Sequence, residues 1–116
     1  ESHYSAVGKC LLAFSSNKVL ERFKGQDLPM YTKNTINNWD DLLIELDNVR
    51  SRGYAVDNEE LEIGLTCVAA PILDKENNVI AAISISGPTS RIKSDNFDTI
   101  VNEVKNTAWK ISNLLK

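Results

Sequence analysis

The sequence predicts an α+β fold in which helices pack on a mostly antiparallel sheet. Three observations support this class. Apolar residues recur at helical spacing before Gly53 and again after Ser94. Between these two regions, apolar residues alternate with a period of two residues, which is typical of strands. A short polar turn, residues 74–78, joins two apolar strands as an antiparallel hairpin. The chain has 116 residues, 42% hydrophobic and 25% charged, which is typical of one globular domain.

The first predicted helix covers residues 3–14. Gly8 lies in its middle and weakens the helix by roughly 1 kcal/mol relative to alanine. We therefore interpret Gly8 as a place where another backbone or a ligand comes close. One helical face carries the apolar positions, which are Val7, Cys10, Leu11 and Phe14.

Two further helices are predicted before the sheet. A short helix begins at Ser15 or Ser16 and ends at Gly25. Its inward residues are Val19, Leu20 and Phe23. A stronger helix begins after Asn38, where two aspartates favour the N-terminus, and it stops at Gly53. Its apolar stripe consists of Trp39, Leu42, Leu43, Leu46 and Val49.

Three strands are predicted after Gly53, over residues 54–57, 65–73 and 79–86. The sequence GPTSR ends the sheet, and Ser94 then caps a final helix. We expect this helix to cover the face of the sheet that carries the isoleucines of the last strand. Its own apolar face consists of Phe97, Ile100, Val101, Val104, Ala108, Ile111 and Leu115.

Small polar side chains share one face of the last strand. Because side chains alternate along a strand, Ser84 and Ser86 lie opposite its isoleucines. The same alternation separates Cys67 from the bulky residues of the middle strand, and Asp57 from its apolar neighbour. If the bulky faces point the same way, these four polar side chains converge on the other face of the sheet.

A cavity with an apolar wall and a few convergent polar groups is the usual form of a small-ligand site. The first helix, with small residues at Ser5, Ala6 and Gly8, can cover this face, and its free N-terminal amides favour a carboxylate. The alternation also fits two simpler alternatives: the serines face solvent, and Cys67 belongs to the ordinary core. The acidic sequence DNEELE, residues 57–62, is interpreted as a solvated turn.

Charge and cysteine content exclude several functions for this chain. The net charge is -3 and the basic residues are scattered, which argues against direct contact with nucleic acid. The longest uncharged apolar run, residues 63–73, is too short to cross a membrane. No signal peptide is visible, and the two cysteines lack metal-like spacing, so we expect free thiols in the cytoplasm. No cofactor, metal or catalytic residue is expected.

The tryptophans and the single histidine have simpler interpretations. Trp39 and Trp109 lie on predicted helices and are interpreted as packing residues. Trp109 falls beside the stripe of the last helix, so an oligomer surface is the alternative. His3 is interpreted as an exposed or capping residue near a chain end.

Three ordered motifs resemble the effector-binding domain of the IclR family of bacterial transcriptional regulators. They are HYSAVGKCLLA (residues 3–13), RSRGYAVDNEELEIGLTCVAAPILD (50–74) and VIAAISISGPTSRI (79–92). The resemblance implies a GAF-like fold, with a curved antiparallel sheet and helices on both sides, as a single effector-binding domain over residues 1–116. It also implies cytoplasmic dimers or tetramers that contact DNA through an N-terminal winged helix-turn-helix. By this resemblance, that domain and the first strands of the effector domain are absent from this chain.

In this family, small organic acids bind between the first helix and the sheet. Carried over through the motifs, the ligand-binding positions are Ala6, Val7, Asp57, Leu65, Cys67, Ser84 and Ser86. Val7 departs from relatives, which often have a smaller residue there, and this argues against a bulky ligand. Because an ionised acid repels a carboxylate, Asp57 is expected to accept from a ligand hydroxyl, to be protonated, or to hold a water or cation.

Three functions are compatible with these sequence features. The favoured one is a sensor domain that binds a small carboxylate and changes the DNA affinity of an attached domain. The second is a GAF-like redox enzyme that uses Cys67, but no base and no cysteine pair of catalytic spacing accompanies it. The third is a ligand-free oligomerisation module.

Overall fold

The computed structural model describes residues 5–15, 18, 20–21, 32–60 and 62–115. The elements in chain order are α1 (Ala6–Ala13), α3 (Trp39–Arg52), β1 (Ala55–Asn58), β2 (Leu65–Leu73), β3 (Val79–Pro88), α4 (Thr89–Ile92) and α5 (Phe97–Leu114). His3 and most of the predicted second helix, with Val19, Phe23 and Gly25, lie outside the described residues.

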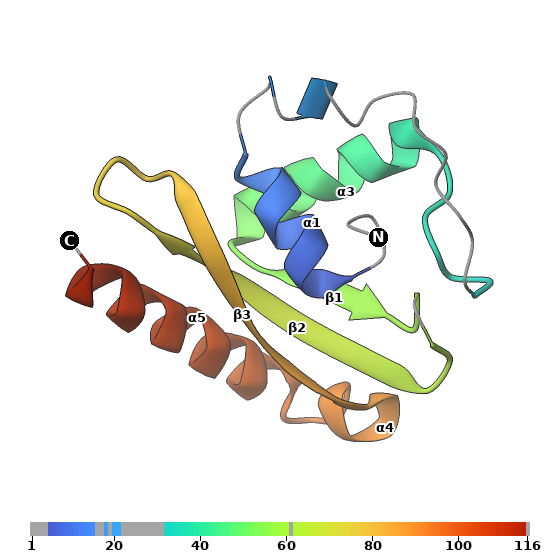
Figure 1. The fold of residues 1–116 in the computed structure, drawn as a ribbon. Coiled ribbons are helices and arrows are strands. Elements are labelled where there is room, and N and C mark those ends of the chain that lie inside the picture. Colours follow the sequence, from blue (N-terminus) through green and yellow to red (C-terminus); the bar gives the residue numbers. More distant parts are fainter. Residues whose placement is uncertain (1–4, 16–17, 19, 22–31, 61, 116) are drawn as a thin grey trace.

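The sheet has three antiparallel strands in the order β1-β2-β3 (Figure 1). The hairpin between β2 and β3 is confirmed, and its turn is closed by Asp74, whose Oδ1 accepts from the amides of Glu76 and Asn78 at 2.9 Å each. β1 starts one residue later than predicted, and β3 continues to Pro88. A register shift at Ile72/Leu73 adds an irregularity next to the hairpin turn.

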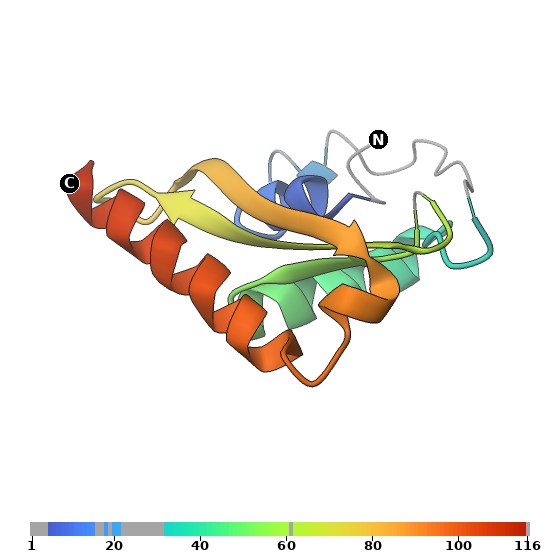
Figure 2. The ribbon, with the colours of Figure 1, turned by 90° about the horizontal axis from the view of Figure 1, so that it is seen from below.

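Helices cover both faces of the sheet (Figure 2). α1 packs on one face and α3 packs against α1, whereas α5 packs on the other face. This arrangement confirms the α+β prediction. The α1 side has an apolar core of Ala6, Cys10, Leu12, Ala13, Leu42, Leu46, Val49, Ala55 and Ala69. The α5 side has a second core of Val68, Ala70, Ile72, Ile92, Val101, Val104 and Ala108.

α3 begins and ends where its sequence predicts. Asn38 Oδ1 accepts from the amide of Asp41 at 2.9 Å, and Gly53 closes the helix with a φ of 84°, a left-handed conformation that suits glycine. Trp39 packs against the core as predicted. The placement of Leu43 on the buried stripe is wrong, because its side chain is 39% exposed. One step along a helix rotates a side chain by about 100°, so Leu43 turns away from buried Leu42.

The start of the last helix differs from the prediction. The chain first forms α4, and α5 begins only at Phe97, so Ser94 is not its cap. The Ser94 hydroxyl instead donates to the carbonyl of Arg91 at 2.8 Å. The C-terminal end of α5 also differs from the prediction, which placed Leu115 on the buried face. Leu115 is 59% exposed, and the last buried residue of α5 is Ser112. The Ser112 hydroxyl donates to the carbonyl of Ala108 and accepts from the amide of Leu73.

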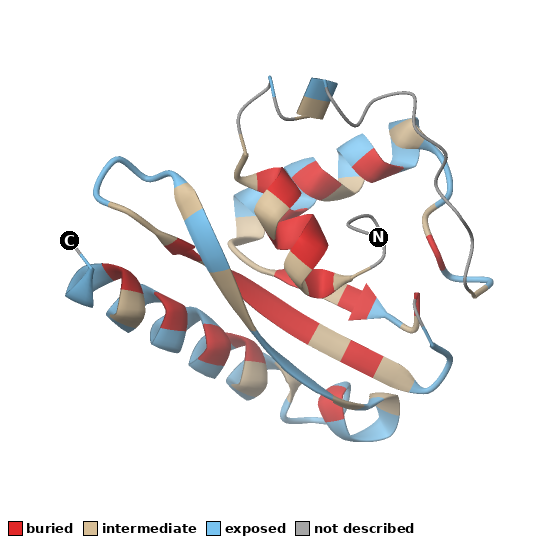
Figure 3. Ribbon diagram, in the orientation of Figure 1, coloured by how far each residue is buried: buried red, intermediate tan, exposed pale blue. Residues whose placement is uncertain are grey.

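Burial is concentrated along β2 and on the helix sides that face the sheet (Figure 3). β3 lies at the edge of the sheet, and several of its residues are exposed. The prediction that Trp109 packs in the interior is wrong, because it is 65% exposed on α5. Among the described residues, no helix is long and apolar enough to cross a membrane.

Candidate functional site

The register of the sheet brings the predicted polar side chains together. Asp57 on β1 pairs with Cys67 on β2, which in turn pairs with Ser86 on β3. Ser84 lies in the next row of the same face, opposite Ala69. Residues that pair directly across strands point to the same face of a sheet. The prediction that these four residues share one face is therefore confirmed.

α1 lies over this face. Ala6 is buried, and half-buried Val7 packs against the same core as Cys67. Leu65 is half-buried at the start of β2 and belongs by alternation to the same face as Cys67.

Ser84 and Ser86 are exposed on β3, which is one of the two edge strands of the sheet. Ser84 also borders a hollow of about 340 Å³ on the α5 side, lined by Ile83, Ile85, Glu103, Val104 and Thr107 as well. This hollow lies on the opposite face of the sheet from α1.

The N-terminus of α1 presents amides that have no carbonyl partner within the helix. Ser5 is the N-cap, and its hydroxyl accepts from the amide of Gly8 at 2.9 Å. The amide of Lys9 donates to the carbonyl of Ser5 in the first helical turn. The first amides of a helix have no carbonyl partner within it, so those of Ala6 and Val7 stay free of intrahelical bonds. These two amides are the donors that the sequence assigned to a carboxylate.

Asp57 is 2% exposed, so the interpretation of a solvated side chain is wrong. The carboxylate closes a turn: its Oδ1 accepts from the amide of Glu60 at 2.8 Å, while Glu59 takes a left-handed φ of 59°. Glu60 is buried as well, and Asn58 and Glu62 are exposed. The acidic segment 57–62 is thus buried in part, because the turn supplies hydrogen bonds to its charged groups.

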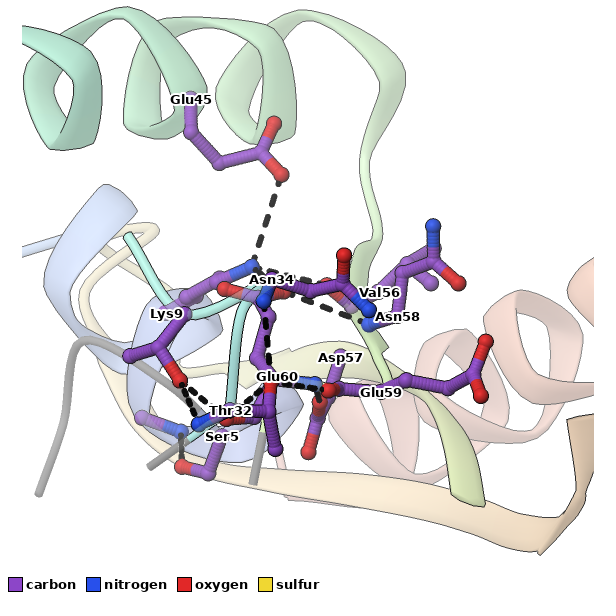
Figure 4. Close-up of polar contacts among 12 residues, drawn as sticks. Ser5, Lys9, Thr32, Asn34, Glu45, Val56, Asp57, Asn58, Glu59 and Glu60 are labelled. Atoms are coloured by element: carbon purple, nitrogen blue, oxygen red, sulfur yellow. Dashed lines mark hydrogen bonds and ion pairs between the residues drawn. The ribbon is translucent and has the colours of Figure 1, made fainter. Parts of the chain in front are cut away.

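Lys9 is the residue near this site that sequence reasoning missed. Its side chain is fully buried, and Nζ donates to the carbonyl of Val56 at 2.9 Å and to the carboxylate of Glu60 (Figure 4). Glu45 of α3 lies 3.6 Å from the same nitrogen. Lysine is almost never fully buried without a partner, and the partners lie far away in sequence. The sequence feature that could have indicated its burial is the position of Lys9 among the small and apolar residues of the first motif.

Burial governs the acidities around the site. It raises the pKa of Cys10 to about 12. Burial also raises the pKa of Cys67, the charge of Asp57 adds to this, and a hydrogen bond with Ser86 opposes it. Both cysteines are free thiols. A thiol with a raised pKa holds little thiolate at neutral pH and is a weak nucleophile.

Burial also raises the pKa of Glu60, against the opposing effect of the Lys9 ammonium. Within the described part of the chain, no group of three or more His, Cys, Asp and Glu side chains is placed to hold a metal ion.

Residues 1–113 match the family described as Bacterial transcriptional regulator IclR C-terminal. The chain is 40% identical over 111 residues to the HTH-type transcriptional regulator KdgR of Dickeya chrysanthemi, covering 95% of this chain and 36% of that protein. The crystal structure of the Thermotoga maritima IclR superposes with a TM-score of 0.92 at 40% identity, covering 99% of this chain and 47% of that one.

A further match is an Acinetobacter PobR inducer-binding domain, a double mutant in complex with 3-hydroxybenzoic acid. Its TM-score is 0.86 at 30% identity, over 97% of this chain and 66% of that one.

The fold and these matches show that this chain is an effector-binding domain of a bacterial transcriptional regulator. The matched proteins are regulators and not enzymes. The chain belongs to the IclR family, and it corresponds to the C-terminal domain of that family. This confirms the resemblance carried by the three motifs and disfavours a redox enzyme based on Cys67. The chain spans less than half the length of the curated relatives it matches.

Proposed function

We propose that this chain senses a small organic acid held between α1 and the sheet, and that occupancy changes DNA binding by an attached helix-turn-helix domain. The observation that carries the proposal is the polar row of Asp57, Cys67 and Ser86 beneath α1. The acid bound by the PobR inducer-binding domain supports the same class of ligand. The chain's net charge of -3 supports the assignment of DNA contact to a separate domain.

The carboxylate of the ligand binds the amides of Ala6 and Val7. These amides lie at the positive end of the α1 dipole, where an anion is stabilised. The hydroxyls of Ser84 and Ser86 are both donors and acceptors, so they can serve a hydroxyl, a ketone or a carboxylate. Half-buried Val7 and Leu65 limit the width of the site and favour a small acid.

Asp57 binds the opposite end of the ligand. One of its oxygens accepts from the amide of Glu60. A second negative charge nearby repels an ionised acid, so Asp57 accepts from a ligand hydroxyl instead of meeting the ligand's carboxylate. This orientation keeps the two negative groups at opposite ends of the site.

Occupancy acts on DNA only if the ligand binds two arrangements of the protein with different affinity. The proposed means is a change in how two copies of this domain associate. The regulator is proposed to work as a cytoplasmic dimer or tetramer, as the motif resemblance to the IclR family implies.

Calorimetry tests the ligand class. Pyruvate, gluconate and 3-hydroxybenzoate represent keto, sugar-derived and aromatic acids, and the primary amide of each serves as its neutral control. We expect one class of acid to bind and its amide to bind much more weakly, because the amide lacks the charge that the α1 amides stabilise. Equal affinity for acid and amide would contradict the carboxylate assignment. Absence of binding by every acid would favour the oligomerisation module.

A further inference from the structure

Lys9 connects four separate parts of the fold through one buried ammonium group. The lysine belongs to α1, the carbonyl of Val56 to β1, Glu60 to the turn after β1, and Glu45 to α3. Figure 4 shows these groups converging on the Lys9 nitrogen. Movement of α1 away from any of these partners would lengthen one of the contacts of the ammonium group.

Both of the proposed ligand anchors are close in sequence to groups of this contact. Val56, whose carbonyl binds Lys9 at 2.9 Å, directly precedes Asp57. Ala6 and Val7 lie within one helical turn of Lys9 on the same rigid helix. The contact therefore joins the helix that carries these amides to the strand that carries Asp57.

Glu60 is held as firmly as Lys9. Its amide donates to Asp57, and its main-chain carbonyl accepts from the hydroxyls of Thr35 and Thr32. Its Oε2 accepts from Lys9, whereas Oε1 is buried with no hydrogen-bond partner among the described residues. A buried carboxylate oxygen without a hydrogen bond lowers the stability of the folded chain.

Stability alone does not explain this pair. Replacement of a buried ion pair by apolar residues of similar volume is often neutral or stabilising. What apolar residues cannot supply is a directional contact that holds α1 at one height above β1. The geometry points to that role.

We propose that Lys9 is the positioning residue of the effector site and that its ammonium, held by Glu60 and Val56, keeps the α1 amides at a fixed distance from Asp57. This inference rests on the proposed function, since it assigns a role toward the carboxylate bound there.

The test compares the double variant Lys9→Met/Glu60→Gln with the wild-type chain. This change removes one positive and one negative charge, so the net charge beside the site is unchanged. The matched control is Lys110→Met/Glu103→Gln, the same two substitutions at exposed positions of α5. Urea unfolding followed by tryptophan fluorescence establishes that each variant folds.

Alkylation of Cys67 reports the site without knowledge of the natural ligand. Cys67 is half-buried on the proposed site, whereas Cys10 is fully buried. The two reagents are iodoacetate, itself a small carboxylate, and neutral iodoacetamide. Peptide mass mapping gives each rate at Cys67, and the ratio of the two rates is divided by the same ratio for glutathione. This normalised selectivity measures how well the site attracts a carboxylate.

In wild type we expect a normalised selectivity of about ten, a factor that corresponds to about 1.4 kcal/mol. The reason is that the carboxylate of iodoacetate gains more from the α1 amides than it loses to the charge of Asp57, which pairs with Cys67. It should fall to about one in the double variant and stay at the wild-type value in the α5 control. Unchanged selectivity in a folded double variant would overturn the positioning role. A wild-type value of about one would instead overturn the proposed carboxylate site, so the two failures are distinguishable.

If the double variant does not fold, Glu60→Gln alone carries the test. Lys9 then keeps Val56 and Glu45 but loses its nearest charge partner. Removal of a negative charge by itself would raise the selectivity for a carboxylate, whereas positioning by the ion pair predicts lower selectivity in this variant. Selectivity equal to or above that of wild type would therefore contradict the positioning role.

Discussion

Charged side chains lie in the interior beside the effector site, and each depends on particular partners. Lys9, Asp57 and Glu60 are all less than 5% exposed. The Lys9 ammonium offsets the charge of Glu60, and the Glu60 amide hydrogen-bonds Asp57. Removal of one partner would leave another charge buried without compensation, which is far more costly than loss of an exposed charge.

Substitution of a single serine tests the strand side of the site. Loss of one neutral hydrogen bond costs about 0.5–1.5 kcal/mol, so Ser84→Ala should weaken binding of the identified acid by roughly 2- to 13-fold. Calorimetry measures the change, and Ser90→Ala, at an exposed position of α4, is the control. Unchanged affinity in both Ser84→Ala and Ser86→Ala would show that these serines do not contact the ligand.

The burial of Glu60 predicts a pH dependence of stability. Burial raises its pKa in the folded chain, so its contribution is complete below the unfolded pKa and is lost as pH rises through the folded pKa. Glutamine does not titrate. Between about pH 4 and 7, the unfolding free energy of Glu60→Gln should therefore lose less with rising pH than that of wild type. Urea titrations at several pH values measure both slopes.

The control for this slope is Glu62→Gln, at an exposed position of the same turn. Its slope gives the effect of removing a carboxylate at an exposed position, and the Glu60→Gln slope should depart further from that of wild type. A Glu60→Gln slope equal to that of wild type would show that Glu60 has the same pKa in the folded and unfolded chains.

Among the helices and strands, those with local start and stop signals follow their sequences best. α3 has its cap at Asn38, acidic residues in its first turn and Gly53 at its end. β2 and β3 follow the alternation of their side chains, with Ile83 toward α5 and Ser84 on the other face. α5 lacks a capping hydrogen bond at its N-terminus, and there the predicted start is wrong.

The cap of α3 provides a test at the scale of one element. Asn38→Ala removes the bond to the Asp41 amide and should lower the unfolding free energy by about 1 kcal/mol. Asn48→Ala, at an exposed position inside the same helix, should be neutral or slightly stabilising because alanine has the higher helix propensity. Urea unfolding measures both. Equal effects of the two substitutions would argue against the cap.

Across the whole molecule, large apolar side chains remain exposed at the outer side and end of α5. Trp109 is 65% exposed and Leu114 is 83% exposed. Nearby, a hollow of about 290 Å³ is lined by Trp109 together with Gly53, Ala70, Pro71, Leu73, Asn77, Lys105, Ala108 and Ser112. Exposed apolar surface of this kind often belongs to a contact between proteins.

We therefore predict self-association of this chain through the Trp109 side of α5. Sedimentation velocity at micromolar concentration should show dimers or larger species, and Trp109→Ser should shift the population toward monomer because it removes apolar contact area. Lys110→Ser, at the next exposed position, is the control and should leave the distribution unchanged. A purely monomeric wild-type chain would contradict the prediction.

The sequence by itself determined the class of fold, the hairpin, the bounds of α3 and the shared face of Asp57, Cys67 and the two serines. These features depend on neighbours in the chain: helical or strand periodicity, caps, and turn residues. The three motifs also determined the family. Side-chain alternation was enough to group the serines with Cys67, because a strand has only two faces.

Only the tertiary structure decided which charged residues are buried. Lys9 is charged and lies beside Gly8, so local rules assign it to solvent, and the same rules assign Asp57 and Glu60 to a solvated turn. Lys9 and Glu60 pair with each other, although they are 51 residues apart in the sequence. The free energy of a buried charge depends on the groups that surround it in space, and packing of α1 on the sheet brings those groups together.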